Sequence, residues 1–220
     1  MAQSTRPVFL TRNGHPYFTE TGITFPFFPG MSAAQKKRNV VSLHESFKEY
    51  FPDKPVLEIS SKSLQAEGEP LSAFFLPKFV PSLGKSVPVE CVYQGGKVFE
   101  HGGPYTDLYE ATPRAAKKDE RLKTSGALIA FEFEGKRFPI KPTTLFYDFI
   151  YINALLENPE LAEKALTFDA FTDIEFNPKH SAACQARSVA KFVSIKRAGL
   201  IDQVRDPETF RKLLVIDSYF

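Results

Sequence analysis

Proline sets the strongest limit on what this chain can fold into, because 17 of its 220 residues are prolines spread along the whole length. Proline has a fixed φ and no backbone N–H, so it stands in turns, at sheet edges or in the first turn of a helix. No internal repeat and no low-complexity linker divides the chain. We therefore predict an α+β fold, in which a mostly helical single domain surrounds a small sheet of short strands.

The composition excludes several classes of protein. The chain is 43% hydrophobic and 25% charged, which is typical of a globular protein. No apolar run approaches the roughly 18 residues of a membrane-spanning helix, and residues 1–7 lack the apolar segment of a signal peptide. A net charge of +2 argues against a protein that coats nucleic acid, but it allows a pocket for one nucleotide. We expect a cytoplasmic protein that does not contact membranes.

The residues that bind metals or form disulfides are few. Cys91 and Cys184 provide neither a disulfide framework nor a four-ligand zinc site, and we expect free buried thiols. No metal-ligand spacing is found among the histidines, which are His15, His44, His101 and His180. We therefore predict no metal and no cofactor.

The first fifty residues are expected to form a separate layer. Residues 1–30 alternate loosely between apolar and polar types, which indicates edge strands or a packed arm. Ser32 is predicted to cap a helix that ends near Tyr50. The apolar stripe of this helix consists of Val40, Leu43, Phe47 and Tyr50. We predict an N-terminal aromatic arm and helix over residues 1–50, packed on a core domain of residues 51–220.

The rest of the chain is predicted to alternate short strands and helices. Strands are expected at residues 56–60, 71–76, 127–133, 136–140 and 170–176. Helices are expected at residues 88–101, 114–123, 143–158, 159 onward, 181–197 and 207 onward. The charged run in 114–123 is typical of a solvated helix.

A polar trio in the predicted helix of residues 88–101 is the first candidate site. At about 100° per residue, Glu90, Gln94 and Lys97 fall within about 60° of one another. Such a trio is usually a solvated face. However, two adjacent glycines at 95–96 each cost about 1 kcal/mol inside a helix, which indicates close approach of another backbone or of a ligand.

Three further segments could bind a nucleotide. A predicted strand is surrounded by three acids, Asp169, Asp173 and Glu175. They either recognise ribose hydroxyls or act in acid–base catalysis, or they are simply a turn aspartate and solvent-facing strand positions. Arg187 follows a predicted helix start, either as part of an anion site or as a surface residue. The serines of 60–63 follow a buried strand, where they either line a cleft or form a plain turn.

In this order, the segments resemble the NADAR family, which includes the YbiA-like N-glycosidases. The family's F-S-N-F strand is represented by Leu71-Ser72-Ala73-Phe74, and its E-H-x-x-Q-x-x-K-F helix lies within Val89–Phe99. The later family motifs correspond to Ile152–Leu161, Leu166–Asp169 and Ile174–Pro178. The similarity covers roughly residues 56–195 and rests on the ordered set of motifs.

The whole chain looks like the stand-alone NADAR antitoxins that accompany DarT-type ADP-ribosyltransferase toxins. The blocks similar to that subgroup are Leu57–Ser63, Gly102–Tyr109 and Cys184–Ser188. YbiA-like members carry a D-x-x-W-G stretch, whereas this chain has no tryptophan and has Cys91 in place of the motif histidine. The resemblance implies an N-glycosidase that removes ADP-ribose from guanine bases of DNA or RNA, paired functionally with a DarT-type toxin.

The resemblance also implies roles for individual residues. Glu90 and Lys97 are the expected catalytic pair. The expected substrate-binding residues are Ser61, Ser63, Ser72, Phe74, Gln94, Asp169, Glu175 and Arg187. Among them, Asp169 and Glu175 would hold ribose hydroxyls, and Ser61, Ser63 and Arg187 would contact the diphosphate.

Two mechanisms and two other functions stay open at this point. In the first mechanism, Glu90 activates water or protonates the leaving group, and a second carboxylate stabilises the cationic sugar. In the second, Lys97 forms a Schiff base with the opened sugar, and Glu90 moves the protons. The chain is alternatively a non-catalytic ADP-ribose-binding antitoxin, or an N-glycosidase acting on a small nucleotide by-product.

Overall fold

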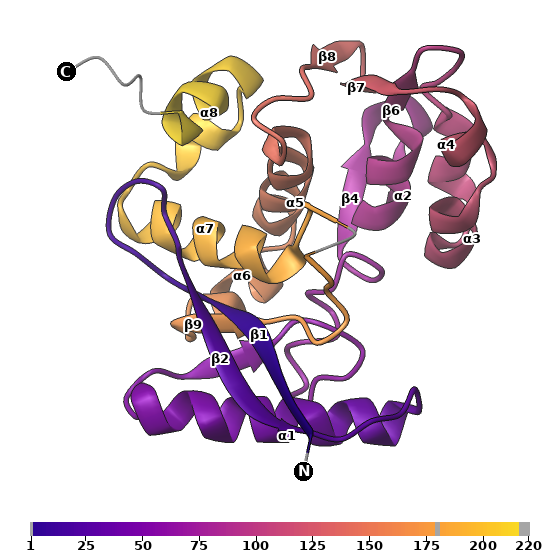
Figure 1. Cartoon of the computed structure of the whole chain (residues 1–220). Coiled ribbons are helices and arrows are strands. Elements are labelled where there is room, and N and C mark those ends of the chain that lie inside the picture. The colour runs from indigo at the N-terminus through magenta and orange to yellow at the C-terminus, as the bar shows by residue number, and fades with distance from the viewer. Residues whose placement is uncertain (1, 179–180, 216–220) are drawn as a thin grey trace. The chain divides into compact units, whose positions relative to one another are not determined.

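The computed structural model describes residues 2–178 and 181–215 (Figure 1). Short strands form three small sheets in this part of the chain, and helices lie between them, so the predicted α+β class is confirmed. The chain divides into two compact units. Unit 1 consists of Met1–Ser72 and Glu160–Ile201, and unit 2 of Ala73–Pro159 and Asp202–Phe220. The predicted boundary after residue 50 stays a prediction.

Unit 1 is built around a four-stranded sheet with the order β2-β1-β9-β3. Strands β1 (Ala2–Leu10) and β2 (Thr19–Phe27) form a long antiparallel hairpin. Strand β9 (Ala170–Thr172) pairs antiparallel with the end of β1 and parallel with β3 (Val56–Glu58). The N-terminal residues therefore supply the predicted edge strand of the sheet.

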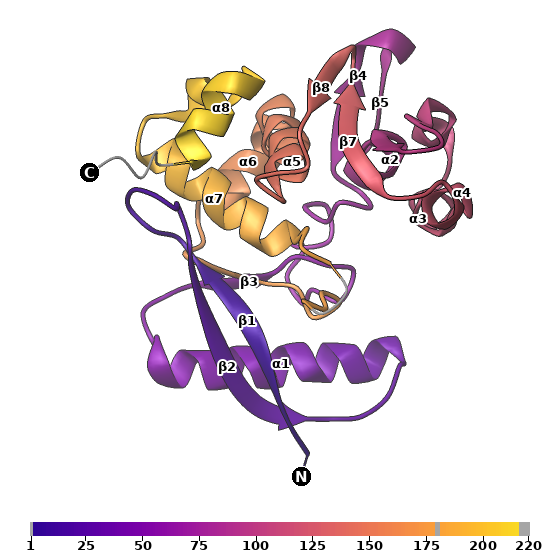
Figure 2. The same cartoon turned by 45° about the horizontal axis from the view of Figure 1, so that its top comes forward.

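Helix α1 (Ala33–Tyr50) packs against β2 and crosses the hairpin in both views (Figures 1 and 2). It begins as predicted, because the Ser32 hydroxyl accepts a hydrogen bond from the Gln35 backbone N–H at 3.2 Å. The predicted stripe is wrong at Tyr50, which is 70% exposed. Phe51, just beyond the helix, stacks on Phe47 at 4.9 Å and takes the place expected for Tyr50.

The C-terminal part of unit 1 is helical. Helix α6 (Pro159–Ala165) begins at the unit boundary, and α7 (Gln185–Arg197) packs on β9 and β1. The strand predicted for 170–176 ends at Thr172, because the chain turns there and the Ile174 N–H bonds to the Glu58 carboxylate at 2.8 Å.

Unit 2 contains two small antiparallel sheets. Strands β4 (Pro77–Val80) and β5 (Lys85–Pro88) form a hairpin through the 3-10 turn η1 (Pro81–Leu83). The other sheet has the order β6-β7-β8. Its strands are β6 (Lys97–Phe99), β7 (Leu128–Phe133) and β8 (Lys136–Phe138), and the last two form the predicted hairpin.

The helices of unit 2 are mostly short. They are α2 (Val89–Gly95), η2 (Thr106–Glu110), α3 (Pro113–Lys118), α4 (Arg121–Thr124), α5 (Leu145–Glu157) and α8 (Pro207–Leu214), and η3 (Ile201–Val204) spans the unit boundary. Helix α5 is buried over most of its surface and packs on α2 and α8. Within the described residues, no helix combines the length and the hydrophobicity that crossing a bilayer requires.

Three predicted elements of unit 2 are wrong in extent. No strand forms at 71–76, because the carbonyls of Ala73 and Leu76 accept the first N–H groups of α2 instead of pairing in a sheet. The helix predicted for 88–101 ends at Gly95, and the chain continues as β6, which pairs with β7. The helix predicted for 114–123 breaks at Asp119, whose carboxylate accepts from the Arg121 backbone and side chain.

The packing of α1 gives a testable expectation. Replacing the fully buried Phe47 with alanine should lower the free energy of unfolding by about 3–5 kcal/mol, because the cavity is lined by a rigid core. The matched variant Tyr50→Ala, on the exposed end of the same helix, should change it by less than about 0.5 kcal/mol. Urea titration followed by circular dichroism measures both. Equal losses in the two variants would contradict the observed burial.

Candidate functional site

Three of the predicted residues form a continuous hydrogen-bonded chain in unit 2. The Gln94 side-chain amide donates to Glu90 Oε1 at 2.9 Å, and Lys97 Nζ donates to Gln94 Oε1 at 2.6 Å. Glu90 and Gln94 lie on α2, but Lys97 lies at the start of β6. The trio therefore comes together as predicted, although not on the single helix face that we expected.

The two glycines at the end of α2 are required by the protein itself. A methyl group added at Gly95 would lie 2.6 Å from the ring of Tyr109. One added at Gly96 would lie 2.7 Å from the ring of Phe146 and 2.8 Å from the carbonyl oxygen of Glu132. We expected the glycines to allow close approach either of another backbone or of a ligand. The observed close contacts are with backbone and side-chain atoms of unit 2 itself.

Lys97 is the most perturbed amine of this group. Its pKa is lowered to about 8, mainly by burial; the negative charge of Glu90 opposes this shift, and the positive charge of Lys117 adds to it. The ammonium lies 4.8 Å from the centre of the Tyr93 ring. A lysine with a pKa near 8 has a substantial neutral fraction near physiological pH, and the neutral form is the nucleophile.

The Tyr93 ring beside Lys97 belongs to a cluster of aromatic rings. Tyr93 contacts Phe131, Phe146 and Tyr147 with ring-centre distances of 5.7, 6.3 and 5.0 Å. Burial raises the pKa of the Tyr93 phenol, so this hydroxyl stays protonated. The buried Lys97 amine therefore has an aromatic ring, packed against other rings, as one of its neighbours.

The predicted substrate-binding residue Phe74 joins the same group through Lys117 of α3. Lys117 Nζ lies 5.5 Å from the centre of the Phe74 ring and 3.8 Å from Glu90 Oε1. Phe74, Glu90, Gln94, Lys97 and Lys117 are called the lysine cluster below. The cluster offers a nearly buried carboxylate, an amine that deprotonates readily and a solvent-exposed cation.

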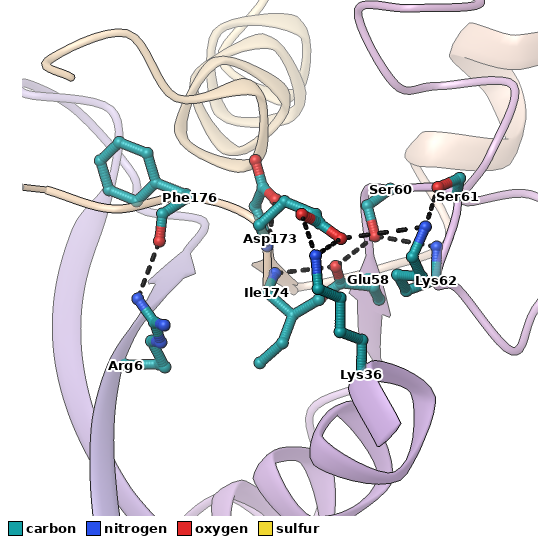
Figure 3. A network of polar contacts seen from close by, with 10 residues as sticks. Arg6, Lys36, Glu58, Ser60, Ser61, Lys62, Asp173, Ile174 and Phe176 are labelled. Atoms are coloured by element: carbon teal, nitrogen blue, oxygen red, sulfur yellow. Dashed lines mark hydrogen bonds and ion pairs between the residues drawn. The ribbon is translucent and has the colours of Figure 1, made fainter. Parts of the chain in front are cut away.

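A second polar group lies in unit 1 and is called the acid cluster: Glu58, Asp173 and Glu175. Figure 3 shows Glu58 and Asp173 from close by. The fully buried Glu58 accepts hydrogen bonds from the hydroxyls of Ser60 and Thr172, both at 2.6 Å. Burial raises the pKa of Glu58, and these hydrogen bonds oppose the rise. Burial and the negative charge of Glu58 together raise the pKa of Asp173 to about 8.

The sequence patterns missed Glu58, and they indicated Asp173 as a candidate acid without assigning it a substrate-binding role. Glu58 lies inside a strand that was predicted to be buried, and a buried acid needs hydrogen-bond donors around it. This position could have identified Glu58 as a candidate. The donors come from Ser60 and from residues more than 110 positions away, Thr172 and Ile174. That long separation is why the sequence pattern alone did not identify the acid cluster.

His44 of α1 extends this network. Its Nε2 lies 2.8 Å from the Thr172 hydroxyl. Because that hydroxyl donates its proton to Glu58, it accepts from His44, and Nε2 therefore carries a proton. Burial, followed by the positive charge of Lys48, lowers the pKa of His44 to about 4. The imidazole is neutral at physiological pH.

Two predicted ribose-binding acids are ion-paired within unit 1. Glu175 lies 2.8 Å from Lys36 Nζ and 3.8 Å from Lys62 Nζ. Asp169 lies 2.6 Å from a guanidinium nitrogen of Arg197 on α7. Glu175 belongs to the acid cluster, whereas Asp169 connects the start of β9 to α7. Their predicted contacts with ribose stay predictions.

The predicted diphosphate-binding residues also lie in unit 1. The Ser61 hydroxyl accepts from Lys62 Nζ at 2.5 Å, whereas the Ser63 hydroxyl bonds to the backbone of Gln65 in a tight turn. The Arg187 guanidinium donates to the Ala182 carbonyl and lies 6.0 Å from the ring of Phe9. These contacts hold the side chains in place, and their roles toward a diphosphate stay predictions.

The predicted site residues are thus divided between the two units. Unit 2 contains Phe74, Glu90, Gln94 and Lys97, and unit 1 contains Ser61, Ser63, Ser72, Asp169, Glu175 and Arg187. Within unit 2, all four predicted residues belong to the lysine cluster. Within unit 1, the predicted residues are dispersed, and Ser72 donates its backbone N–H to the Glu69 carbonyl in a turn.

The predicted free buried thiols are confirmed. Cys91 and Cys184 are buried and unpaired, and burial raises the pKa of Cys91 to about 11. Among residues 2–178 and 181–215, no three His, Cys, Asp or Glu side chains are placed to hold a metal ion. His180 lies outside the described residues.

The burial of His44 predicts a specific pH dependence of stability. Below its ordinary pKa of 6.5, the unfolded chain binds a proton that the folded chain excludes until about pH 4. The contribution of the neutral His44 to the free energy of unfolding is therefore fully present above pH 6.5 and is lost as the pH falls toward 4.

The variant His44→Gln keeps an N–H donor for Thr172 but does not titrate. The free energy of unfolding of the wild-type protein should therefore fall more steeply than that of the variant between pH 6.5 and pH 4. Urea titrations at four pH values provide the comparison. Parallel pH profiles would show that folding does not exclude a proton from His44.

Comparison with known proteins identifies the family of the chain. A family model described as "DarT1-associated NADAR antitoxin" matches residues 4–219. A search of curated proteins found no match. The matched range includes the β1–β2 hairpin and α1, which lie outside the 56–195 segment that carried the predicted resemblance. The chain belongs to the family of DarT1-associated NADAR antitoxins.

Proposed function

We propose that this chain is an ADP-ribosyl glycohydrolase that removes ADP-ribose from guanine in nucleic acid and so acts as the antitoxin of a DarT1-type toxin. The observation that carries the proposal is the hydrogen-bonded chain Glu90–Gln94–Lys97, in which a carboxylate and a lysine with a lowered pKa share one bridging amide. Membership of the family supports the pairing with a toxin.

The reaction breaks the N-glycosidic bond between ribose C1 and the exocyclic amine of guanine. Such a cleavage needs a proton for the leaving nitrogen and a partner for the electron-poor carbon. Glu90 can transfer protons, and the neutral amine of Lys97 can attack the carbon. Gln94 contacts both side chains, so it holds them at a fixed separation.

In the proposed route, the ribose ring opens first. A proton moves from the exocyclic nitrogen to the ring oxygen, which leaves a C1=N imine on guanine. The Lys97 amine adds to C1, and its two protons pass to the guanine nitrogen with Glu90 as the carrier. The guanine amine then leaves, and C1 and Lys97 Nζ are joined as a Schiff base. Water adds to C1 and releases the ribose aldehyde, which closes to free ADP-ribose.

Release of ADP-ribose from guanine-ADP-ribosylated DNA tests the function directly. The wild-type protein should release ADP-ribose, and Lys97→Ala and Glu90→Ala should each lose at least about 100-fold in rate, because each removes a group that moves a proton or attacks carbon. The exposed α4 variant Lys123→Ala is the matched control and should retain full activity.

The same variants separate the other functions. Protection of cells from a DarT1-type toxin by Glu90→Ala would indicate a non-catalytic ADP-ribose-binding antitoxin and would contradict the hydrolase. Preference for free nucleotides over modified DNA in competition would indicate a small-molecule N-glycosidase.

Borohydride reduction during turnover tests the covalent step. We expect an adduct on the peptide containing Lys97 with the mass of ADP-ribose less one oxygen atom, since Schiff-base formation loses water and reduction adds two hydrogens to give a stable amine. Peptide mass spectrometry detects it, and Lys97→Ala is the control that should show none. An active Lys97→Ala enzyme without any adduct would favour direct activation of water by Glu90.

A further inference from the structure

Lys117 of α3 is a member of the lysine cluster to which the proposed mechanism gives no role. Its Nζ lies 3.8 Å from Glu90 Oε1, the same oxygen that accepts the Gln94 amide at 2.9 Å. The Glu90 side chain is 7% exposed, whereas the Lys117 side chain is 60% exposed. A cation therefore reaches from solvent to a carboxylate that α2 holds almost buried.

A buried carboxylate requires charged or hydrogen-bonding partners. Gln94 supplies a hydrogen bond but no charge, so the positive charge beside Glu90 comes from a lysine. Two lysines surround the carboxylate, Lys117 in direct ion-pair range and Lys97 through the Gln94 amide. Only one of them needs to stay charged to compensate Glu90.

The two lysines differ in burial. The Lys117 side chain is 60% exposed, so solvent stabilises its charge. Lys97 is desolvated beside the Tyr93 ring, and the positive charge of Lys117 disfavours a second ammonium nearby. Phe74 supports this arrangement, because its ring lies 5.5 Å from Lys117 Nζ and keeps the cation at the carboxylate.

Three other cations on the surrounding elements are paired with acids other than Glu90. Lys78 of β4 pairs with Glu157, Lys85 of β5 pairs with Glu110, and Arg121 of α4 pairs with Asp107 and Asp119. The remaining titratable groups on α2, η2, β7 and α5 are Cys91, Tyr93, Tyr109, Glu132, Tyr147, Asp148 and Tyr151. Glu90 and Lys117 are the charges that act on Lys97.

We propose that Lys117 is a positioning residue of the lysine cluster: its ammonium pairs with Glu90 in place of Lys97, which leaves the Lys97 amine free to attack. Removing the Lys117 charge leaves Lys97 as the cation that compensates Glu90. Lys97 is then held in the charged form, which does not attack carbon. The inference rests on the proposed function only for its activity readout.

The first test measures the ionisation of Lys97 without any substrate. Competitive labelling with fluorodinitrobenzene across a pH series, followed by peptide mass spectrometry, gives the pKa of Lys97 in the whole protein. In Lys117→Met the value should rise by at least about half a pH unit. Lys117→Arg, which keeps the charge, should match the wild type. Lys118→Met, the exposed neighbour on α3, is the control for loss of charge and should also match it.

The second test is the pH–rate profile for release of ADP-ribose. Because the neutral amine attacks, the rate rises with pH through the pKa of Lys97. In Lys117→Met the rising limb should move to higher pH, with an approximately threefold loss of kcat at pH 7 that is recovered near pH 9. Lys117→Arg should restore the wild-type profile.

Each outcome decides one claim. An unchanged Lys97 pKa in Lys117→Met overturns the positioning role, whatever the enzyme's activity. A loss of activity that is equal at every pH also overturns it, since that pattern belongs to a purely structural or substrate-binding residue. A raised Lys97 pKa in a protein that releases no ADP-ribose supports the role of Lys117 and contradicts only the proposed function.

Discussion

The close packing at the end of α2 is the constraint on which the lysine cluster depends. Gly95 and Gly96 allow the ring of Tyr109 and the backbone of β7 to approach where a side chain would collide. The Glu132 N–H then bonds to the Gly96 carbonyl at 2.7 Å, and the helix gives way to a strand. This change of structure directs Lys97 back toward Gln94. A longer helix would have carried its amine more than one turn past Glu90.

Glu58 has a comparable organising role in unit 1. Its carboxylate bonds to the hydroxyl of Thr172 and to the N–H of Ile174, which fixes the turn that follows β9. Asp173 lies within that turn, and Glu175 after it donates its backbone N–H to the Asp173 carboxylate at 3.0 Å. A single buried acid thereby arranges a chain segment that is more than 110 residues away in sequence.

Elements that depend on local sequence were predicted correctly, and the errors arise where contacts between distant segments decide the structure. The Ser32 cap, the β7–β8 hairpin and the helix starting at Pro207 follow from local chemistry and are confirmed. The segment 71–76 has the apolar pattern of a strand, but two of its carbonyls accept hydrogen bonds from the first N–H groups of α2. No sequence pattern predicts that these carbonyls cap a helix. Lys117 was predicted to lie on a solvated helix, and it does; its contact with Glu90 depends on how α3 packs on α2.

The lysine cluster shows how one carboxylate can give two identical side chains different roles. In water, both lysines would be charged near pH 7. In the proposed arrangement their burial separates them, because one amine is buried beside the Tyr93 ring, which lowers its pKa to about 8, and the other extends into solvent. The exposed lysine compensates the carboxylate, so the enclosed lysine does not have to. The net charge of the chain, +2, is therefore a poor guide to the proposed chemistry, in which the arrangement of three charges within unit 2 determines which amine attacks.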